Sequence, residues 1–327
     1  MSGRRLRIVY FGTPDFAVPC LEGLLAGRHE VVGVVSQPDR GRGRGRKRTP
    51  SPVAARALAA DLPLLRPERV GAAEVIETLA GWEPDLGVVA AFGQFLPRRV
   101  RELPALGYLI NAHASLLPRF RGAAPIARAI LEGDRRTGIS VMRVEREMDA
   151  GAVALVRETE IGPDENCGEL TARLAALAAE AIAEAIEAIA EGRVRWTAQD
   201  PDAATLAPKL SREDARLDWS DDAISLARRV RAMAPRPGAF TTLAGAPLRI
   251  LASRVVEGEP DRAPGTVQRI EGDTPLRVAT ARHWLAPLTL QRAGGKPMAI
   301  DAFLRGRPLE DGTVLGDAAA PDSAPAS

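Results

Sequence analysis

The stretch Tyr108-Leu-Ile-Asn-Ala-His-Ala-Ser-Leu-Leu-Pro118 carries the pattern on which the fold assignment rests. The apolar run at its start is typical of the end of a buried strand, and Asn111, His113 and Ser115 follow at alternate positions. Residues two apart in an extended chain point to the same side, so the amide and the imidazole should project together. Ligands of open α/β sheets bind beyond the carboxyl ends of strands, and we therefore expect a functional site here. The alternative is a strand end that holds a hydrogen-bonded core histidine.

The chain before this stretch repeats a strand-and-helix pattern. Leu6–Phe11 is an apolar strand, Gly12 allows a turn, and Phe16–Leu25 has helical spacing. Glu30–Val35 and Leu86–Ala91 have the composition of further buried strands. A strand, a glycine turn and a helix in this order predict an α/β protein with a doubly wound, Rossmann-like, mostly parallel sheet. A full G-x-G-x-x-G fingerprint is absent, so a dinucleotide cofactor is poorly supported.

Two further strands and a long helix should complete this domain. Ile139–Val144 alternates as a sheet strand does, and Val153–Ile161 is its expected antiparallel partner. Asp149 falls between them, where a lone aspartate is usually a turn former. Glu169–Ile189 has apolar residues at helical spacing and predicts a long amphipathic helix. We place the end of the first domain at Gly192.

The composition of the sequence changes after residue 192. Residues 193–208 are rich in alanine, aspartate and proline and are expected to form a linker. Beyond them, short apolar runs alternate with Gly, Pro and Asp at roughly ten-residue intervals. This spacing predicts a small antiparallel β-barrel over residues 209–315. Residues 316–327 have the composition of a disordered tail.

The overall composition is that of an ordinary globular protein. The 327 residues are 46% apolar and 26% charged, with a formal net charge of +2, which predicts about two domains and no global case for nucleic-acid binding. Cys20 and Cys167 are far apart, and only three histidines are present, so we expect no metal site. No apolar stretch approaches the ~18 residues of a membrane span, and the first residues leave no room for a signal peptide. We therefore expect a cytoplasmic protein.

The stretch Gln37–Pro52 has the most unusual composition in the chain. Basic residues alternate with glycines, which oppose a stable helix and allow a mobile backbone. One interpretation is a solvated, flexible loop, and the other is a loop that binds a phosphate backbone on the ligand side of the sheet. The basic residues are Arg40, Arg42, Arg44, Arg46, Lys47 and Arg48.

Three motifs together resemble the signature of the 10-formyltetrahydrofolate-dependent formyltransferases. They are Asn111-Ala-His-Ala-Ser-Leu-Leu-Pro118, Arg121-Gly-Ala-Ala-Pro125 and Asp149-Ala-Gly151, in the expected order. The resemblance runs from about Leu6 to Leu315 and is closest to those members that formylate the amino group of initiator methionyl-tRNA. It implies an OB-like barrel in the second domain, 10-formyltetrahydrofolate as co-substrate and no metal. We also expect a monomer.

The resemblance further implies roles for individual side chains. Asn111 would donate its amide N–H to the formyl oxygen, and His113 would act as a second electrophile or relay a proton. Asp149 would hold His113 in one tautomer and help to deprotonate the amine. The folate pocket, with Phe92 and Leu96 as apolar surface for the pterin ring, would comprise Phe92, Gly93, Leu96, Ser115, Leu116, Leu117 and Pro118. The tRNA would contact Arg40, Arg42, Arg44, Arg46, Lys47, Arg48 and Lys209, with Arg44 aligned to the recognition arginine of the family.

Other functions share part of this pattern. Formyltransferases that act on glycinamide ribonucleotide usually lack a second barrel domain, and those that act on amino sugars do not need so basic a loop. A non-catalytic RNA-binding protein that uses the loop and the barrel is an alternative of another class, but it would not require Asn111, His113 and Asp149. Basic residues in the second domain fit a tRNA-facing channel and ordinary surface charge equally well.

Overall fold

The computed structural model describes residues 4–42, 47–272 and 275–316. Of the tail predicted over residues 316–327, residues 317–327 lie outside the described residues. Within the described ranges, no helix has both the length and the apolar character needed to cross a membrane. Contacts group the chain into two compact units: Met1–Pro125, Arg136–Glu160 and Thr171–Pro208 in the first, and Ile126–Arg135, Ile161–Leu170 and Lys209–Ser327 in the second.

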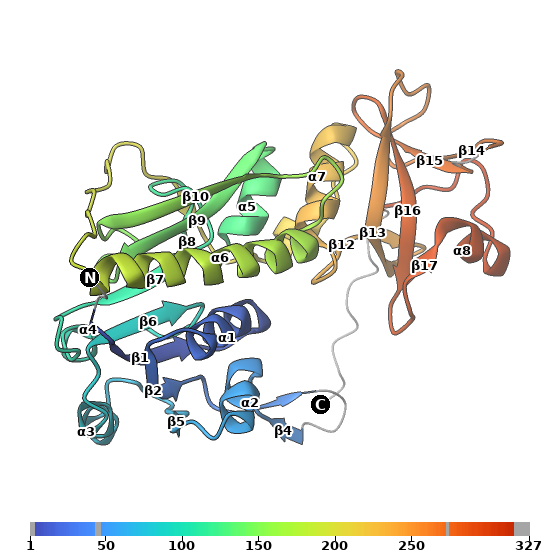
Figure 1. Cartoon of the computed structure of the whole chain (residues 1–327). Helices are drawn as coiled ribbons and strands as arrows, with labels where there is room; N and C mark the ends of the chain where they lie inside the picture. Colours follow the sequence, from blue (N-terminus) through green and yellow to red (C-terminus); the bar gives the residue numbers. More distant parts are fainter. Residues whose placement is uncertain (1–3, 43–46, 273–274, 317–327) are drawn as a thin grey trace. The chain divides into compact units, whose positions relative to one another are not determined.

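A seven-stranded sheet forms the centre of the first unit, in the order β10-β9-β7-β6-β1-β2-β5 (Figure 1). Its strands are β1 (Arg7–Gly12), β2 (Glu30–Val35), β5 (Leu64–Leu65), β6 (Leu86–Ala90), β7 (Leu109–His113), β9 (Arg136–Arg143) and β10 (Val153–Glu160). The neighbouring strands β5, β2, β1, β6 and β7 pair in parallel, whereas β9 runs antiparallel to both β7 and β10. The predicted doubly wound, mostly parallel architecture is confirmed, including the antiparallel pair at one edge.

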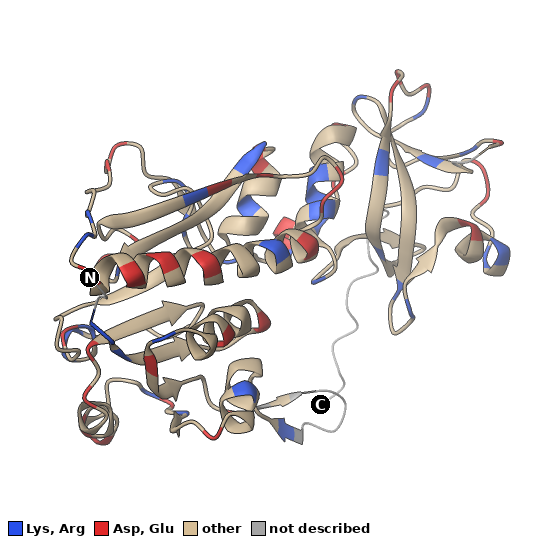
Figure 2. Ribbon diagram, viewed as in Figure 1, with Lys and Arg blue, Asp and Glu red and all other residues tan. Residues whose placement is uncertain are grey.

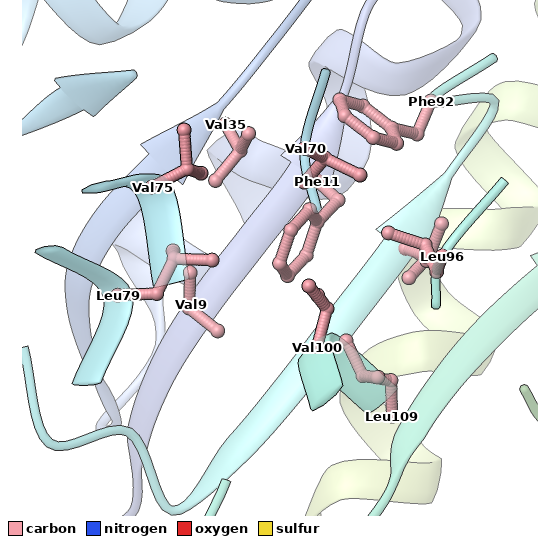
Figure 3. Close-up of a cluster of buried hydrophobic side chains, with 11 residues drawn as sticks. Val9, Phe11, Val35, Val70, Val75, Leu79, Phe92, Leu96, Val100 and Leu109 are labelled. Atoms are coloured by element: carbon pink, nitrogen blue, oxygen red, sulfur yellow. The ribbon is translucent and has the colours of Figure 1, made fainter. Parts of the chain in front are cut away.

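Helices cover both faces of this sheet because its strands are apolar on both sides. They are α1 (Val18–Ala26), α2 (Pro52–Ala59), α3 (Ala73–Gly81), α4 (Arg98–Arg101) and most of α6 (Cys167–Ala190), with a 3₁₀ turn over Asp15–Ala17. On one face, Phe11 and Leu109 belong to a buried cluster with residues of α3 and α4 (Figure 3). On the other face, the buried Tyr10 donates its hydroxyl to the carbonyl of Ala17 at 2.6 Å, just before α1.

The direction of winding changes between β1 and β6. The chain builds β1, β2 and β5 to one side and then β6, β7 and β9 to the other, and ligands bind at such switch points. Thr13, after β1, donates its hydroxyl to the carbonyl of Phe92, after β6, at 2.8 Å. Gln37, after β2, donates its amide to the same carbonyl at 3.3 Å. Three strand ends are thus joined at one point, and β7 ends beside them as the partner of β6.

Part of the basic stretch forms a hairpin. β3 (Arg40–Arg42) pairs antiparallel with β4 (Lys47–Thr49), and Asp39 at its base accepts a hydrogen bond from Arg66 at 2.6 Å. This pairing differs from the flexible loop that the glycines suggested, because alternation of arginine with glycine also suits the two-residue period of a strand. Arg44 and Arg46, like the side chains of Arg40, Arg42 and Lys47, lie outside the described part of the structure.

The second unit is built on an antiparallel sheet in the order β12-β13-β16-β15-β14, with β17 paired to β16. The strands are β12 (Ala239–Leu243), β13 (Ala246–Val256), β14 (Val267–Arg269), β15 (Leu276–Ala279), β16 (Trp284–Arg292) and β17 (Met298–Ala299). Leu243, the last residue of β12, bridges to Leu315, and Thr266, just before β14, bridges to Val314. Both edges of the sheet thus contact the same terminal segment. The predicted antiparallel β domain is therefore confirmed.

Two helices of the second unit, α7 (Ala223–Met233) and α8 (Ile300–Gly306), pack on this sheet. The unit also contains most of α5 (Pro125–Glu132) and a 3₁₀ turn over Glu213–Ala215. α7 packs on β13 and β16 and buries Leu226, Val230 and Met233. Asp222 caps α7 by accepting hydrogen bonds from the backbone of Ile224 and Ser225. α8 is only seven residues long.

In the first unit, His29 hydrogen-bonds both to the chain just before β1 and to α6. Its side chain is 6% exposed, and its Nδ1 accepts a hydrogen bond from the backbone N–H of Leu6 at 3.0 Å. The neutral ring therefore carries its proton on Nε2 and donates it to Glu187, 3.1 Å away. Burial lowers the pKa of His29 from its ordinary value, although the carboxylate of Glu187 acts in the opposite direction.

We expect His29 to make the stability of this unit depend on pH. Its pKa in the folded state is lowered from 6.5, so the unfolded chain binds the proton more readily and stability is lost as the pH falls below that value. In His29→Asn, the side-chain oxygen can still accept from Leu6 but does not titrate. Thermal unfolding at about pH 7.5 and about pH 5.5 should show a smaller acid-induced loss in the variant than in the native protein. An equal loss in both proteins would contradict this role.

Candidate active site

Strand β7 positions the first two candidate side chains. It continues through Asn111 to His113, three residues past the apolar run, and pairs with β6 on one side and β9 on the other. Asn111 and His113 are two positions apart in this strand and so lie on the same face. His113 is buried and Asn111 is half-buried. Among the described residues, none hydrogen-bonds to the Asn111 amide, which leaves its N–H groups available to a substrate.

The imidazole of His113 is fixed by a backbone carbonyl. Its Nε2 lies 2.8 Å from the carbonyl oxygen of Phe120, which can only accept, so Nε2 carries the proton. Its Nδ1 faces the Oδ2 atom of Asp149 at 3.5 Å, with side-chain exposures of 7% and 16%. The carbonyl of Phe120 therefore sets the neutral tautomer of His113. The sequence analysis expected Asp149 in this role. A proton taken up at Nδ1 would face a carboxylate.

Asp149 reaches this position from the turn between β9 and β10. Its Oδ2 atom accepts a hydrogen bond from the backbone N–H of Gly122 at 2.9 Å. Gly151 completes the turn, and any side chain there would collide with the carbonyl oxygen of Arg143. The structure thus brings the carboxylate and the imidazole together from segments 36 residues apart in the chain, positions 113 and 149.

Backbone strain is present around these groups. Of the seven described residues that are not glycine and have left-handed φ values, three lie here, namely Ala91 at 44°, Phe120 at 60° and Asp149 at 53°. Such conformations cost free energy and persist where the surrounding structure holds them, which is common at functional sites. Ala91 follows β6, Phe120 holds His113, and Asp149 carries the carboxylate. The three residues therefore mark the same edge of the sheet.

The turn after β7 is held by two serines. The buried Ser115 donates its hydroxyl to the carbonyl of Arg119 at 2.6 Å. Ser140 on β9 accepts from the backbone N–H of Leu117 at 3.1 Å and donates to the carbonyl of Ser115 at 2.7 Å. The hydroxyl of Ser115 is thus used within the turn and supports the predicted folate pocket, whereas Leu116, Leu117 and Pro118 remain half-buried. The sequence analysis did not identify Ser140, because a serine in an alternating strand does not stand out.

The loop after β6 places its large side chains differently from the prediction. Phe92 and Leu96 are buried in the core, and the Phe92 ring packs edge-on against Phe11 with centroids 5.5 Å apart. They were expected to offer apolar surface to a flat ring, but alternate positions of the loop turn inward to cover the sheet. Gly93, with a φ of 85°, is exposed, and Phe95 is 68% exposed. The exposed residues of the loop are therefore Ala91, Gly93 and Phe95.

Gln199 is a site residue that sequence analysis did not identify. Its Nε2 donates to the carbonyls of Asp149 at 2.8 Å and Gly151 at 2.7 Å. Its Oε1 accepts from Nε and Nη2 of Arg121 at 3.0 and 2.8 Å. Gln199 lies in the segment predicted to be a linker, whose composition carries no sign of these contacts. The segment is in fact part of the first unit and adjoins the site.

Other candidate chemistries find little support in this unit. Cys20 is buried, and burial raises the pKa of its thiol to about 12, so a nucleophilic role is not supported. Within the described residues, no group of three or more His, Cys, Asp or Glu side chains could hold a metal ion.

Helix α7 of the second unit carries Arg228, Arg229 and Arg231 (Figure 2), and Asp221 and Asp222 precede it. Arg229 binds the carboxylate of Asp221 at 3.0 Å, and Arg231 donates to the carbonyl of Glu165 at 3.2 Å. These two arginines have structural partners within their own unit. Lys209, predicted to contact tRNA, is exposed.

Comparisons with known proteins cover nearly the whole chain. A model of the formyl transferase family matches residues 5–186, and a model of the formyl transferase C-terminal domain matches residues 209–308. The chain is 43% identical to the methionyl-tRNA formyltransferase of Solibacter usitatus, over 95% of this chain and 99% of that protein. It is 47% identical to the methionyl-tRNA formyltransferase of Chromohalobacter salexigens, over 95% of this chain and 97% of that protein.

Solved structures of lower identity share the fold. HypX from Aquifex aeolicus, solved in complex with tetrahydrofolic acid, matches with a TM-score of 0.63 and 19% identity over 92% of this chain and 47% of that chain. The N-formyltransferase from Helicobacter canadensis, solved in complex with folinic acid and dTDP-3-aminofucose, matches with a TM-score of 0.62 and 13% identity over 86% and 99% of the two chains. At these identities the likeness bears on the fold alone.

Proposed function

This chain belongs to the formyl transferase family, and we propose that it transfers the formyl group of 10-formyltetrahydrofolate to the amino group of initiator methionyl-tRNA. The observation that carries the choice of acceptor is the identity of 43–47% to methionyl-tRNA formyltransferases through both domains. The product would be N-formylmethionyl-tRNA for translation initiation. Such a role places the enzyme with its tRNA substrate in the cytoplasm.

In this reaction the amine nitrogen bonds to the formyl carbon, the bond from that carbon to N10 of the folate breaks, and one proton moves from the amine to N10. An oxyanion develops on the formyl oxygen while both nitrogens are attached. The Asn111 amide, which has no partner among the described residues, is suited to donate an N–H to this oxyanion. A preorganised donor of this kind stabilises the transition state more than the bound substrate.

His113 and Asp149 are suited to the proton transfer. Because Nε2 of His113 is engaged by the carbonyl of Phe120, only Nδ1 can exchange a proton with the reacting groups. Uptake at Nδ1 creates an imidazolium that faces the Asp149 carboxylate, 3.5 Å away. The pair can then return the proton to the leaving N10, directly or through water. Asn111, His113 and Asp149 act as one unit in this scheme.

Binding roles follow the same proposal. Gly93, Leu116, Leu117 and Pro118 present exposed or half-buried groups to the folate, while Phe92, Leu96 and Ser115 support them from the interior. The tRNA is contacted by the basic stretch around the β3–β4 hairpin, with Arg44 as the principal contact, and by Lys209. We also propose a monomer with a catalytic domain at residues 1–192, a connecting segment at 193–208 that packs on this domain, a tRNA-binding domain at 209–315 and a tail at 316–327.

The assay that tests this function compares possible formyl acceptors. Purified protein is mixed with 10-formyltetrahydrofolate and with initiator methionyl-tRNA, free methionine or an amino-sugar nucleotide, and N-formylation of each acceptor is measured. We expect formylation of the charged tRNA and little or none of the other two. Equal activity on free methionine would contradict recognition of the tRNA. Preferential activity on the amino sugar would assign the chain to another branch of the family.

A further inference from the structure

We infer that Gln199 is a positioning residue, which holds the turn around Asp149 so that its carboxylate faces His113. The inference rests on the proposed catalytic role of Asp149. Nothing in the composition of residues 193–208 indicates such a role. It follows from the hydrogen bonds that the Gln199 amide makes in the folded chain.

The amide of Gln199 uses its full hydrogen-bonding capacity at this point. Its two N–H groups bind the carbonyls of Asp149 and Gly151, on either side of Ala150, and its oxygen accepts both bonds from Arg121. A glutamine that makes four hydrogen bonds has one orientation, because both ends of its amide are specified. The turn is therefore held by its backbone on both sides of the residue that follows the carboxylate.

These contacts close a ring around the carboxylate. Arg121 binds Gln199, Gln199 binds the backbone of Asp149, and the Asp149 side chain accepts from the backbone of Gly122, the neighbour of Arg121. The carboxylate and its hydrogen-bond donor are thus tied to the same side chain. Loss of Gln199 would leave the left-handed Asp149, at a φ of 53°, without the bonds to its own carbonyl and to that of Gly151. A strained residue without such support relaxes toward other backbone conformations.

The segment that carries Gln199 is itself anchored at both ends. Thr197 exchanges backbone hydrogen bonds of 2.8 Å with Val153, and β11 (Leu206–Ala207) pairs in parallel with β8 (Arg121–Gly122). Thr205 adds a hydroxyl that accepts from the backbone N–H of Phe120 at 2.9 Å. A side chain on a segment fixed on both sides can hold a catalytic group in place, because its own position is determined.

The experiment compares three single variants in the full-length protein. Gln199→Ala removes the hydrogen bonds to the backbone of the Asp149 turn, Asp149→Asn removes the carboxylate charge, and Asp200→Ala is the matched control. Asp200 is the exposed neighbour of Gln199, and among the residues that the structure describes its carboxylate accepts only from the backbone of Asp202 in the same segment. We expect Gln199→Ala to lower kcat by about 10- to 100-fold, as a small displacement of a reacting group does, with KM for both substrates within about twofold. Asp200→Ala should match the native protein.

The double variant Gln199→Ala/Asp149→Asn gives the decisive measurement. A residue that acts through Asp149 adds little once the carboxylate is lost, so the double variant should be no slower than Asp149→Asn alone. Losses that multiply, a loss seen only in KM, or a Gln199→Ala variant that matches Asp200→Ala would each overturn the inference. Full activity of Asp149→Asn would instead contradict the proposed catalytic role and the inference with it. Unfolding temperatures of all variants separate these effects from loss of folded protein.

Discussion

Replacing Asn111 with alanine is expected to lower turnover by about 10²–10³, the usual effect of removing one oxyanion donor. The side chain is half-buried at the end of β7, and none of the described residues hydrogen-bonds to it, so alanine should leave the fold intact. Folate affinity should change little, because the lost bond forms mainly in the transition state. Single-turnover rates at saturating folate and tRNA would measure the effect directly.

A matched variant separates the lost donor from the lost side chain. Asn111→Asp keeps the shape of the side chain but replaces its N–H group by a carboxylate oxygen, which repels a developing oxyanion. It should be at least as slow as the alanine variant, while folding equally well. A near-normal rate in either variant would remove Asn111 from the mechanism.

The second large effect is expected from Asp149→Asn. The amide oxygen can still accept from the backbone N–H of Gly122, so the turn should keep its shape. The negative charge opposite Nδ1 of His113 is lost, so a proton taken up there no longer faces a carboxylate. We expect turnover to fall by about 10²–10⁴, the range of general acid–base contributions.

The measurement for Asp149→Asn is kcat as a function of pH, with Asp200→Asn as the control for a change of charge on the same unit. The control should follow the native profile. A native rate in Asp149→Asn, or an equal loss in Asp200→Asn, would show that the charge of Asp149 takes no part in proton transfer.

Much of the fold followed from patterns along the chain. The apolar runs of β1, β2, β6 and β7 are buried on both faces and so show little alternation, as expected of central parallel strands. Asn111 and His113 stood out because polar residues at alternate positions are unusual at the end of such a run. Local spacing was sufficient for both, since one strand determines their relative placement.

The parts that were missed depend on contacts between distant segments. Ser140 and Gln199 act through hydrogen bonds to residues 23 and 50 positions away, respectively Leu117 and Asp149, and no local pattern encodes these pairs. The carbonyl of Phe120, which sets the tautomer of His113, belongs to the backbone and carries no signature at all. Phe92 and Leu96 were assigned to ligand-facing surface because hydrophobicity alone does not distinguish a pocket wall from a core.

The anchored segment from Thr197 to Ala207 has a consequence for biosynthesis. A nascent chain that has passed residue 160 already contains every strand of the seven-stranded sheet, together with Asn111, His113 and Asp149. The backbone of the Asp149 turn receives its clamp only when Gln199 has emerged, and β8 receives its partner only with Leu206. The edge of the sheet that carries the proposed catalytic groups is therefore completed late in synthesis, and a fragment that stops at residue 192 would hold these groups without the segment that contacts them.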